Sequence, residues 1–68
     1  MKNNQRLPKG FKVSVNEQGL GRFSVTVNHL GRRVAYFWRN FPSSIHARQT
    51  GVASAIALSE FVQRGIKL

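Results

Sequence analysis

Apolar and polar residues alternate along the first part of the chain. Phe11, Val13 and Val15 alternate with polar residues, and a second segment, from residue 22 to residue 28, repeats this period of two. Such alternation is typical of a strand with one face buried and the other in water. Glycine-containing turns follow each segment, and short turns join antiparallel neighbours. The pattern therefore predicts three antiparallel strands, at Phe11–Asn16, Arg22–Asn28 and Arg33–Arg39.

The third of these segments is apolar on both faces. One face would carry Val34, Tyr36 and Trp38, and the other Ala35 and Phe37. A shift of one residue exchanges the two faces, so the sequence alone leaves both orientations open. We favour burial of Val34 and Tyr36, which places Arg33 and Arg39 on the solvent face. Phe37 and Trp38 cannot easily share one core face, so one of them is a candidate for base stacking or for contact with a partner.

A helical pattern follows the predicted strands. Ser43 or Ser44 can cap a helix from about Ile45 to Arg64, and Gly65 can end it. At about 100° per residue, one stripe contains small residues followed by larger ones, with Phe61 beside it. The stripe consists of Ala47, Gly51, Ala55, Leu58 and Val62. A glycine costs about 1 kcal/mol relative to alanine inside a helix, so Gly51 marks either a break or a close approach to the sheet.

These elements predict an α+β fold, in which a three-stranded antiparallel sheet packs against one C-terminal helix. Sixty-eight residues allow one small domain with a single core. We assign that domain to residues 10–68. Residues 1–9 are polar and basic without periodicity, and we interpret them as a flexible arm that could follow phosphates.

The charge of the chain directs attention to its partners. Eleven Lys and Arg oppose two acidic residues, which gives a formal net charge of +9. This excess favours nucleic acid as partner, and an acidic protein surface comes second. No apolar run approaches the roughly 20 residues that span a bilayer, so we expect no membrane partner. Without cysteine or a recognisable signal peptide, we expect a cytoplasmic protein, associated with the nucleoid if it binds DNA.

Arginines on the predicted solvent face are the first candidates for contact with DNA. An arginine side chain matches the acceptor pair of guanine in the major groove and also pairs with phosphates. Short polar side chains beside the arginines could add hydrogen bonds, although an ordinary solvated sheet face is the competing interpretation. If about six basic side chains met phosphates, log K would fall with log salt at a slope of roughly −5. The candidates from this argument are Arg22, Arg33 and Arg39 with Ser24, Thr26, Asn28 and Lys12.

The sequence does not favour an enzyme. Glu17 lies in a predicted turn and Glu60 on the polar side of the predicted helix, so no pair of carboxylates is suggested. The two histidines have no cysteine or aspartate to complete a metal site. Neither a nucleophile motif nor a phosphate-binding loop is present. We therefore expect no catalytic residues, no metal and no cofactor.

Two segments resemble the Apetala-type (ethylene-response-factor) DNA-binding domain and the related N-terminal arm-binding domains of integrases. These segments are residues 21–27, Gly-Arg-Phe-Ser-Val-Thr-Val, and residues 31–36, Gly-Arg-Arg-Val-Ala-Tyr. Phe41-Pro42-Ser43 and the alanine-rich segment after it are similar to the start of the helix in that family. Departures are Phe23, where the family usually has tryptophan, and the longer segment between Tyr36 and Phe41.

The resemblance implies a DNA-binding module that inserts the exposed face of its sheet into the major groove. It implies a role in recombination or transcription control in a phage or mobile element. Carried over position by position, the contact residues would be Lys12, Ser14, Arg22, Ser24, Thr26, Arg33 and Ala35. Arg39 has no counterpart in the family and rests on the charge argument alone.

Two other functions remain open. The chain could be a basic inhibitor or adaptor that binds an acidic surface of a host enzyme through Phe37 and Trp38. It could also bind RNA through the same sheet. The target sequence and the oligomeric state are not specified by the sequence.

Overall fold

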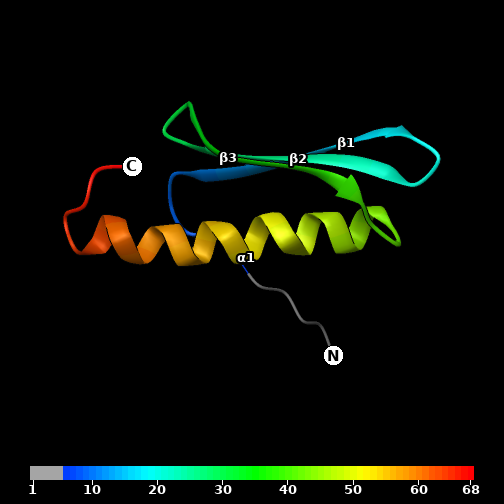
Figure 1. Ribbon diagram of the computed structural model, residues 1–68. Helices are drawn as coiled ribbons and strands as arrows, with labels where there is room; N and C mark the ends of the chain where they lie inside the picture. The colour runs from blue at the N-terminus through cyan, green and yellow to red at the C-terminus, as the bar shows by residue number, and fades with distance from the viewer. Residues whose placement is uncertain (1–5) are drawn as a thin grey trace.

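A computed structural model describes residues 6–68 of the chain. Three strands form one antiparallel sheet in the order β1-β2-β3, and a single helix, α1, crosses one of its faces (Figure 1). This arrangement confirms the predicted α+β fold. The basic residue Lys2 of the predicted arm lies outside the described residues. The elements are β1 (Phe11–Gly19), β2 (Arg22–His29), β3 (Arg32–Asn40) and α1 (Ser44–Gln63).

Two-residue turns join the strands. Leu20 and Gly21 connect β1 to β2, and Leu30 and Gly31 connect β2 to β3. All four residues have positive φ, between 52° and 85°. Turns of this primed type match the right-handed twist of the flanking strands, which keeps the hairpins tight. The turns were predicted from their glycines, but a leucine in the left-handed region at both tips was not.

A bulge in β3 decides which side chains face the helix. Val27 pairs with Ala35, whereas the next residue of β2, Asn28, pairs with Arg33, so Val34 is an extra residue. An extra residue exchanges the two faces of a strand beyond it. Val34 and Ala35 therefore both pack on the helix side of the sheet. The exchange explains why the alternation read from the sequence fails over residues 35–39.

The predicted burial of Tyr36 is wrong for this reason. Tyr36 and Trp38 lie on the solvent face, with 51% and 55% of their surface exposed. Phe37 faces inward and packs against a core cluster of Phe23, Val25 and Ala47. Arg39 consequently belongs to the helix side of the sheet, and not to the solvent face where we expected it.

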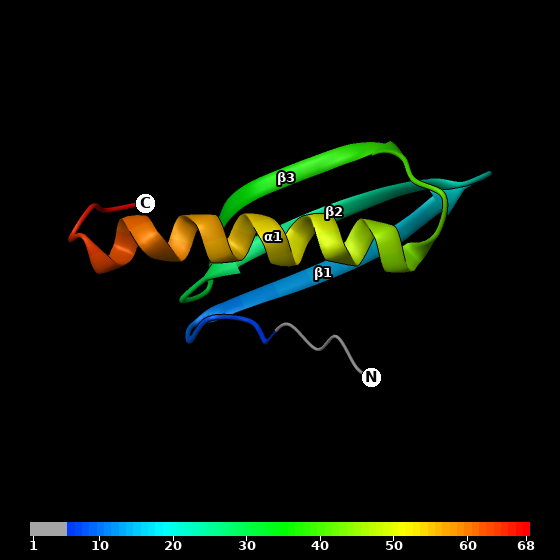
Figure 2. The same ribbon diagram turned by 90° about the horizontal axis from the view of Figure 1, so that it is seen from below.

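The core lies between the sheet and α1, in two adjacent clusters. The second cluster consists of Phe11, Val27 and Ala55, with Leu58 and Val62 of the predicted stripe packed against it. Figure 2 shows α1 in front of the sheet, crossing the strands at an angle, and its packing is chiefly against β1 and β2. Phe61, which the helical pattern placed beside the stripe, is exposed.

Gly51 marks the closest approach of α1 to the sheet and not a break in the helix. It is buried in the middle of the continuous helix. A Cβ atom at this position would lie 2.5 Å from a methyl group of Val13 and 2.7 Å from one of Val25. Only a glycine leaves room for these two valines at this separation.

Both ends of α1 are capped as the sequence predicts. The hydroxyl of Ser43 accepts a hydrogen bond from the backbone N–H of His46, 3.3 Å away, which satisfies one of the free donors of the first turn. At the other end, the N–H groups of Gly65 and Ile66 donate to the carbonyls of Val62 and Phe61, as in a Schellman motif.

The segments that flank the elements also contact the core. Leu7, within the predicted arm, and Leu68, at the other end, both pack against the Phe11 cluster. In the part of the chain that the structure describes, no helix has both the length and the apolar character needed to cross a membrane.

Candidate nucleic-acid interface

The face of the sheet opposite α1 carries most of the residues that the sequence nominated. Side chains alternate between the two faces of a strand, and cross-strand partners share a face. Because Val13, Val25 and Phe37 point to α1, their neighbours point away from it. We call this surface the open face and define it as Lys12, Ser14, Asn16, Arg22, Ser24, Thr26, Asn28, Arg33, Tyr36 and Trp38.

Rows of residues run across the open face, one residue from each strand. Ser14 pairs with Thr26, which pairs with Tyr36. At one end of the face, Lys12 pairs with Asn28, which pairs with Arg33. The short hydroxyl and amide side chains lie on β1 and β2, the two aromatic rings lie on the outer strand β3, and the cations lie near the ends of the strands.

Two arginines lie against the two aromatic rings of the open face. The guanidinium carbon of Arg22 is 5.5 Å from the ring centre of Trp38, and that of Arg33 is 5.3 Å from the ring centre of Tyr36. These distances fall within the range of cation–π contacts. Each contact holds a cation and a flat apolar ring side by side on the open face. This pairing could not be predicted from the residue pattern, because the bulge that turns Tyr36 outward is not visible in the sequence.

Ser24 is on the open face but is not available to a ligand. Only 4% of its surface is exposed, and it lies between Asn16 of β1 and Trp38 of β3. Its hydroxyl accepts a hydrogen bond of 3.1 Å from the side-chain amide of Gln18. Ser24 therefore lies beneath the exposed side chains of the open face. Gln18, which was not predicted as a site residue, covers it with its side-chain amide.

The open face is entirely basic in its charged groups. Lys12, Arg22 and Arg33 are its cations, and all three are exposed. Glu17 pairs with Phe23 at the end of β1 and so belongs by alternation to the other face, while Glu60 is exposed on α1. Neither acidic side chain therefore belongs to the open face.

Three nominated residues lie on the other side of the sheet. Ala35 and Phe37 pack against the two core clusters, so neither side chain lies on the open face. Arg39 contacts the rings of Phe37 and Phe41, with its guanidinium carbon 5.9 Å and 5.4 Å from their centres.

Arg39 nevertheless reaches the edge of the open face. It lines a shallow depression of about 260 Å³ together with Arg22, Trp38 and Asn40. This depression lies where the free edge of β3 meets the side chains of the open face. Arg39 can thus add charge at the rim of the surface without belonging to it.

Comparisons with family models, with curated proteins and with solved structures each give no match. What is established is therefore the architecture itself, a three-stranded antiparallel sheet followed by a C-terminal helix. Within residues 6–68, no group of three or more histidine, aspartate or glutamate side chains could hold a metal ion.

Proposed function

We propose that the protein binds duplex DNA with the open face of its sheet. The observation that carries this proposal is the composition of that face: three cations near the ends of its strands, hydroxyl and amide groups between them and no acidic side chain. Lysine and arginine supply affinity by neutralising phosphates. Arg22 and Arg33 can in addition donate two hydrogen bonds to one guanine.

The dimensions of the sheet agree with this proposal. With strands about 4.8 Å apart, the backbones of the outer strands are separated by roughly 10 Å. The major groove of B-DNA is about 12 Å wide and admits strands as well as helices. Since α1 lies on the opposite face (Figure 1), it would not obstruct the approach of DNA.

The resemblance to Apetala-type and integrase arm-binding domains gives further support. Its element order is that of this chain, and five of the seven contact positions that it implies are exposed or half-exposed on the open face: Lys12, Ser14, Arg22, Thr26 and Arg33. Ala35 and Ser24 depart from it, for the reasons given above. By this analogy the protein would act in recombination or transcription control and would locate to the nucleoid.

Fluorescence anisotropy with a labelled 20-base-pair duplex tests the proposal. Binding should be tighter than about 100 µM at low salt, since non-specific binders reach this value. Arg22→Ala and Arg33→Ala should each weaken binding by roughly fivefold or more, because a bidentate arginine contact contributes about 1–3 kcal/mol.

The matched control is Arg48→Ala, which removes the same charge from an exposed position on α1. It should change the affinity by less than twofold. Equal losses for all three variants would show that net charge alone drives binding, and the absence of binding at 100 µM would overturn the proposal.

The exposed aromatic rings favour a second candidate, single-stranded nucleic acid. Tyr36 and Trp38 are two residues apart on one face, and each could stack on a base, which contributes about 1–3 kcal/mol per base. In this case a single-stranded oligonucleotide would bind more tightly than the duplex. Trp38→Ala would then weaken binding by roughly tenfold, and Trp38→Phe, which keeps a ring, would largely restore it. An acidic protein partner becomes the leading hypothesis if neither nucleic acid binds.

A further inference from the structure

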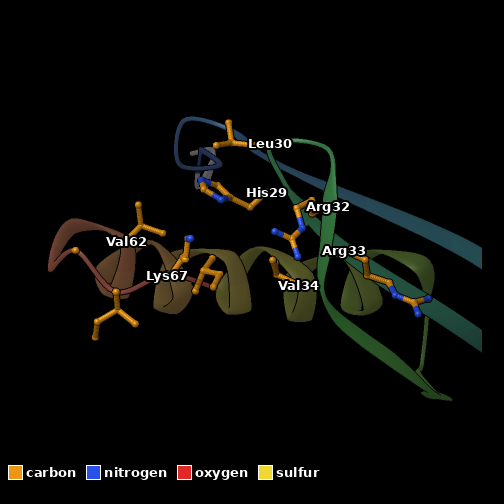
Figure 3. Close-up of a pocket in the computed structure, with 10 residues that line it drawn as sticks. His29, Leu30, Arg32, Arg33, Val34, Val62 and Lys67 are labelled. Atoms are coloured by element: carbon orange, nitrogen blue, oxygen red, sulfur yellow. The ribbon is translucent and has the colours of Figure 1, made fainter.

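A groove opens at the end of the molecule where the β2–β3 turn meets the C-terminal end of α1. Its volume is about 830 Å³, which is within the range of roughly 300–1,000 Å³ for ligand pockets. One wall comes from the β2–β3 turn and the start of β3, and the other from residues 62–68 (Figure 3). Because it lies at one end of the molecule, it is separate from the centre of the open face.

The lining of the groove combines cations with aliphatic side chains. Arg32 and Lys67 supply positive charge, and His29 adds an aromatic ring with two nitrogens. Arg33 also lines the groove, but its guanidinium lies against Tyr36 on the open face. Figure 3 shows His29, Arg32 and Lys67 around the same space. No acidic residue lines it. The aliphatic lining residues are Leu30, Val34, Val62, Ile66 and Leu68.

Two of the aliphatic side chains are not explained by the core. Leu30 is 75% exposed, and Ile66 is also exposed. Leu30 moreover occupies the left-handed region, with a φ of 53°, where asparagine, aspartate and glycine are the usual residues of such a turn. A leucine at this position is unfavourable for the isolated fold, and its exposed side chain is available to a ligand in the groove.

We infer that this groove binds a segment of a partner protein in which carboxylates flank an aliphatic or aromatic side chain. The carboxylates complement the cations, and the apolar side chain covers Leu30 and Ile66. A phosphate backbone would satisfy the cations alone and leave the aliphatic lining in water. A second copy of this chain is a poor occupant, since its net charge is also +9.

This inference does not depend on the proposed binding of DNA. A protein with both surfaces would be an adaptor, holding DNA on its sheet and a partner protein at its end. Only Arg33 belongs to both the open face and the groove, so the test avoids substitutions at that position.

The test is an NMR titration of the uniformly ¹⁵N-labelled chain with two synthetic peptides of equal charge. The first, acetyl-Glu-Leu-Glu-Phe-Glu-amide, carries the apolar side chains, and the second, acetyl-Glu-Ser-Glu-Gly-Glu-amide, lacks them. The first should shift the amide signals of residues 29–34 and 62–68 and saturate below about 1 mM. It should bind at least roughly tenfold more tightly than the second, because burial of one large apolar side chain is worth that factor or more.

The two Leu-Gly turns provide a matched pair of variants. Leu30→Asn removes a groove side chain and should weaken binding of the first peptide by roughly fivefold to tenfold. Leu20→Asn makes the same change in the other turn, outside the groove, and should have no effect. In the same way Lys67→Glu should weaken binding by roughly tenfold, whereas Arg48→Glu, with an equal change in charge, should alter it by less than twofold.

Several outcomes would overturn the inference. Equal affinity for the two peptides would reduce the interaction to non-specific attraction of an acidic chain. The groove would not be a peptide site if the peptide shifted only signals of the open face. The same conclusion would follow if 5 mM peptide caused no shift, since roughly 1 mM is expected to saturate the groove. A 20-base-pair duplex that shifts the groove signals and displaces the peptide would assign the groove to nucleic acid instead. Shifts by the duplex on the open face alone test the proposed function separately.

Discussion

Two leucines occupy a backbone conformation that side chains of L-amino acids avoid. Leu20 and Leu30 have φ values of 52° and 53°. The left-handed region raises the free energy of a residue with a Cβ atom by roughly 1–2 kcal/mol, and this cost is smallest for asparagine after glycine. Leu20 is fully exposed, so burial of its side chain does not stabilise the fold. The backbone strain at the tip of the first hairpin is therefore not compensated by burial of the Leu20 side chain.

Replacement of Leu20 by asparagine should consequently stabilise the protein. We expect Leu20→Asn to raise the free energy of unfolding by about 1 kcal/mol, which corresponds to a rise in Tm of about 4–8 °C for a domain of this size. Thermal denaturation followed by circular dichroism measures the change. Leu20→Ala is the control, because alanine is also disfavoured at positive φ and should give no such gain. A lower Tm for Leu20→Asn would contradict the assigned turn.

Most individual burials could be predicted from the alternation of residue types. Phe23, Val25 and Val27 were assigned to a buried face and are buried. The prediction failed at Tyr36 because a bulge leaves no mark in the pattern of a strand that is apolar on both faces. It failed at Ser24 because the residues beside this serine belong to neighbouring strands. Which residues pair across strands depends on the register of the folded sheet, and the alternation within one strand does not specify it.

At the scale of the elements, Gly51 sets the distance between α1 and the sheet. The sequence offered two meanings for this glycine, a break in the helix or a close contact. Propensity alone could not choose between them, since it counts the cost of a glycine but not the atoms that it meets. The structure decides for close contact, with Val13 and Val25 directly above the glycine.

A methyl group at this position should therefore destabilise the protein. Gly51→Ala gains about 1 kcal/mol in helix propensity, but the added Cβ atom overlaps two valine methyl groups, and such overpacking costs about 1–3 kcal/mol. We expect a net loss of up to about 2 kcal/mol in the free energy of unfolding, measured by urea denaturation.

The control for this substitution uses the closer of the two valines. In a Val13→Ala background the overlap at 2.5 Å disappears, so adding the methyl group to Gly51 should cost less than it does in the native background. An equal cost in both backgrounds would show that the loss arises elsewhere in the helix.

For the whole molecule, the distribution of charge matters more than its total. The net charge of +9 drew attention to nucleic acid, but it could not show which face would bind. The structure assigns three exposed cations to the open face, namely Lys12, Arg22 and Arg33, and leaves several others on α1 and in the groove. The fold was predictable from periodicity and turn residues, whereas the groove was not, because it joins residues 29–34 to residues 62–68, which are distant in the sequence.

The salt dependence of DNA binding measures how many of these cations take part. If only the three cations of the open face meet phosphates, log K should fall with log salt at a slope of about −3. This is shallower than the −5 that the sequence suggested for six contacts. Arg33→Ala should lower the magnitude of the slope by about one, while Arg48→Ala should leave it unchanged. A native slope nearer −8 would indicate that the whole surface, and not the open face, attracts DNA.

The position of α1 has a consequence for the order in which the molecule opens. Because α1 packs chiefly against β1 and β2, β3 is the strand with the least support from the helix, although Val34, Ala35 and Phe37 contact the core clusters. A strand attached in this way is expected to be the first part of the sheet to separate by local unfolding. Tyr36 and Trp38 both belong to β3, so a partner that contacts them binds only the closed form of this strand. A partner bound to the open face would then stabilise β3 by mass action. Any substitution that makes β3 separate more easily would lower the affinity for that partner, because only the closed strand binds it.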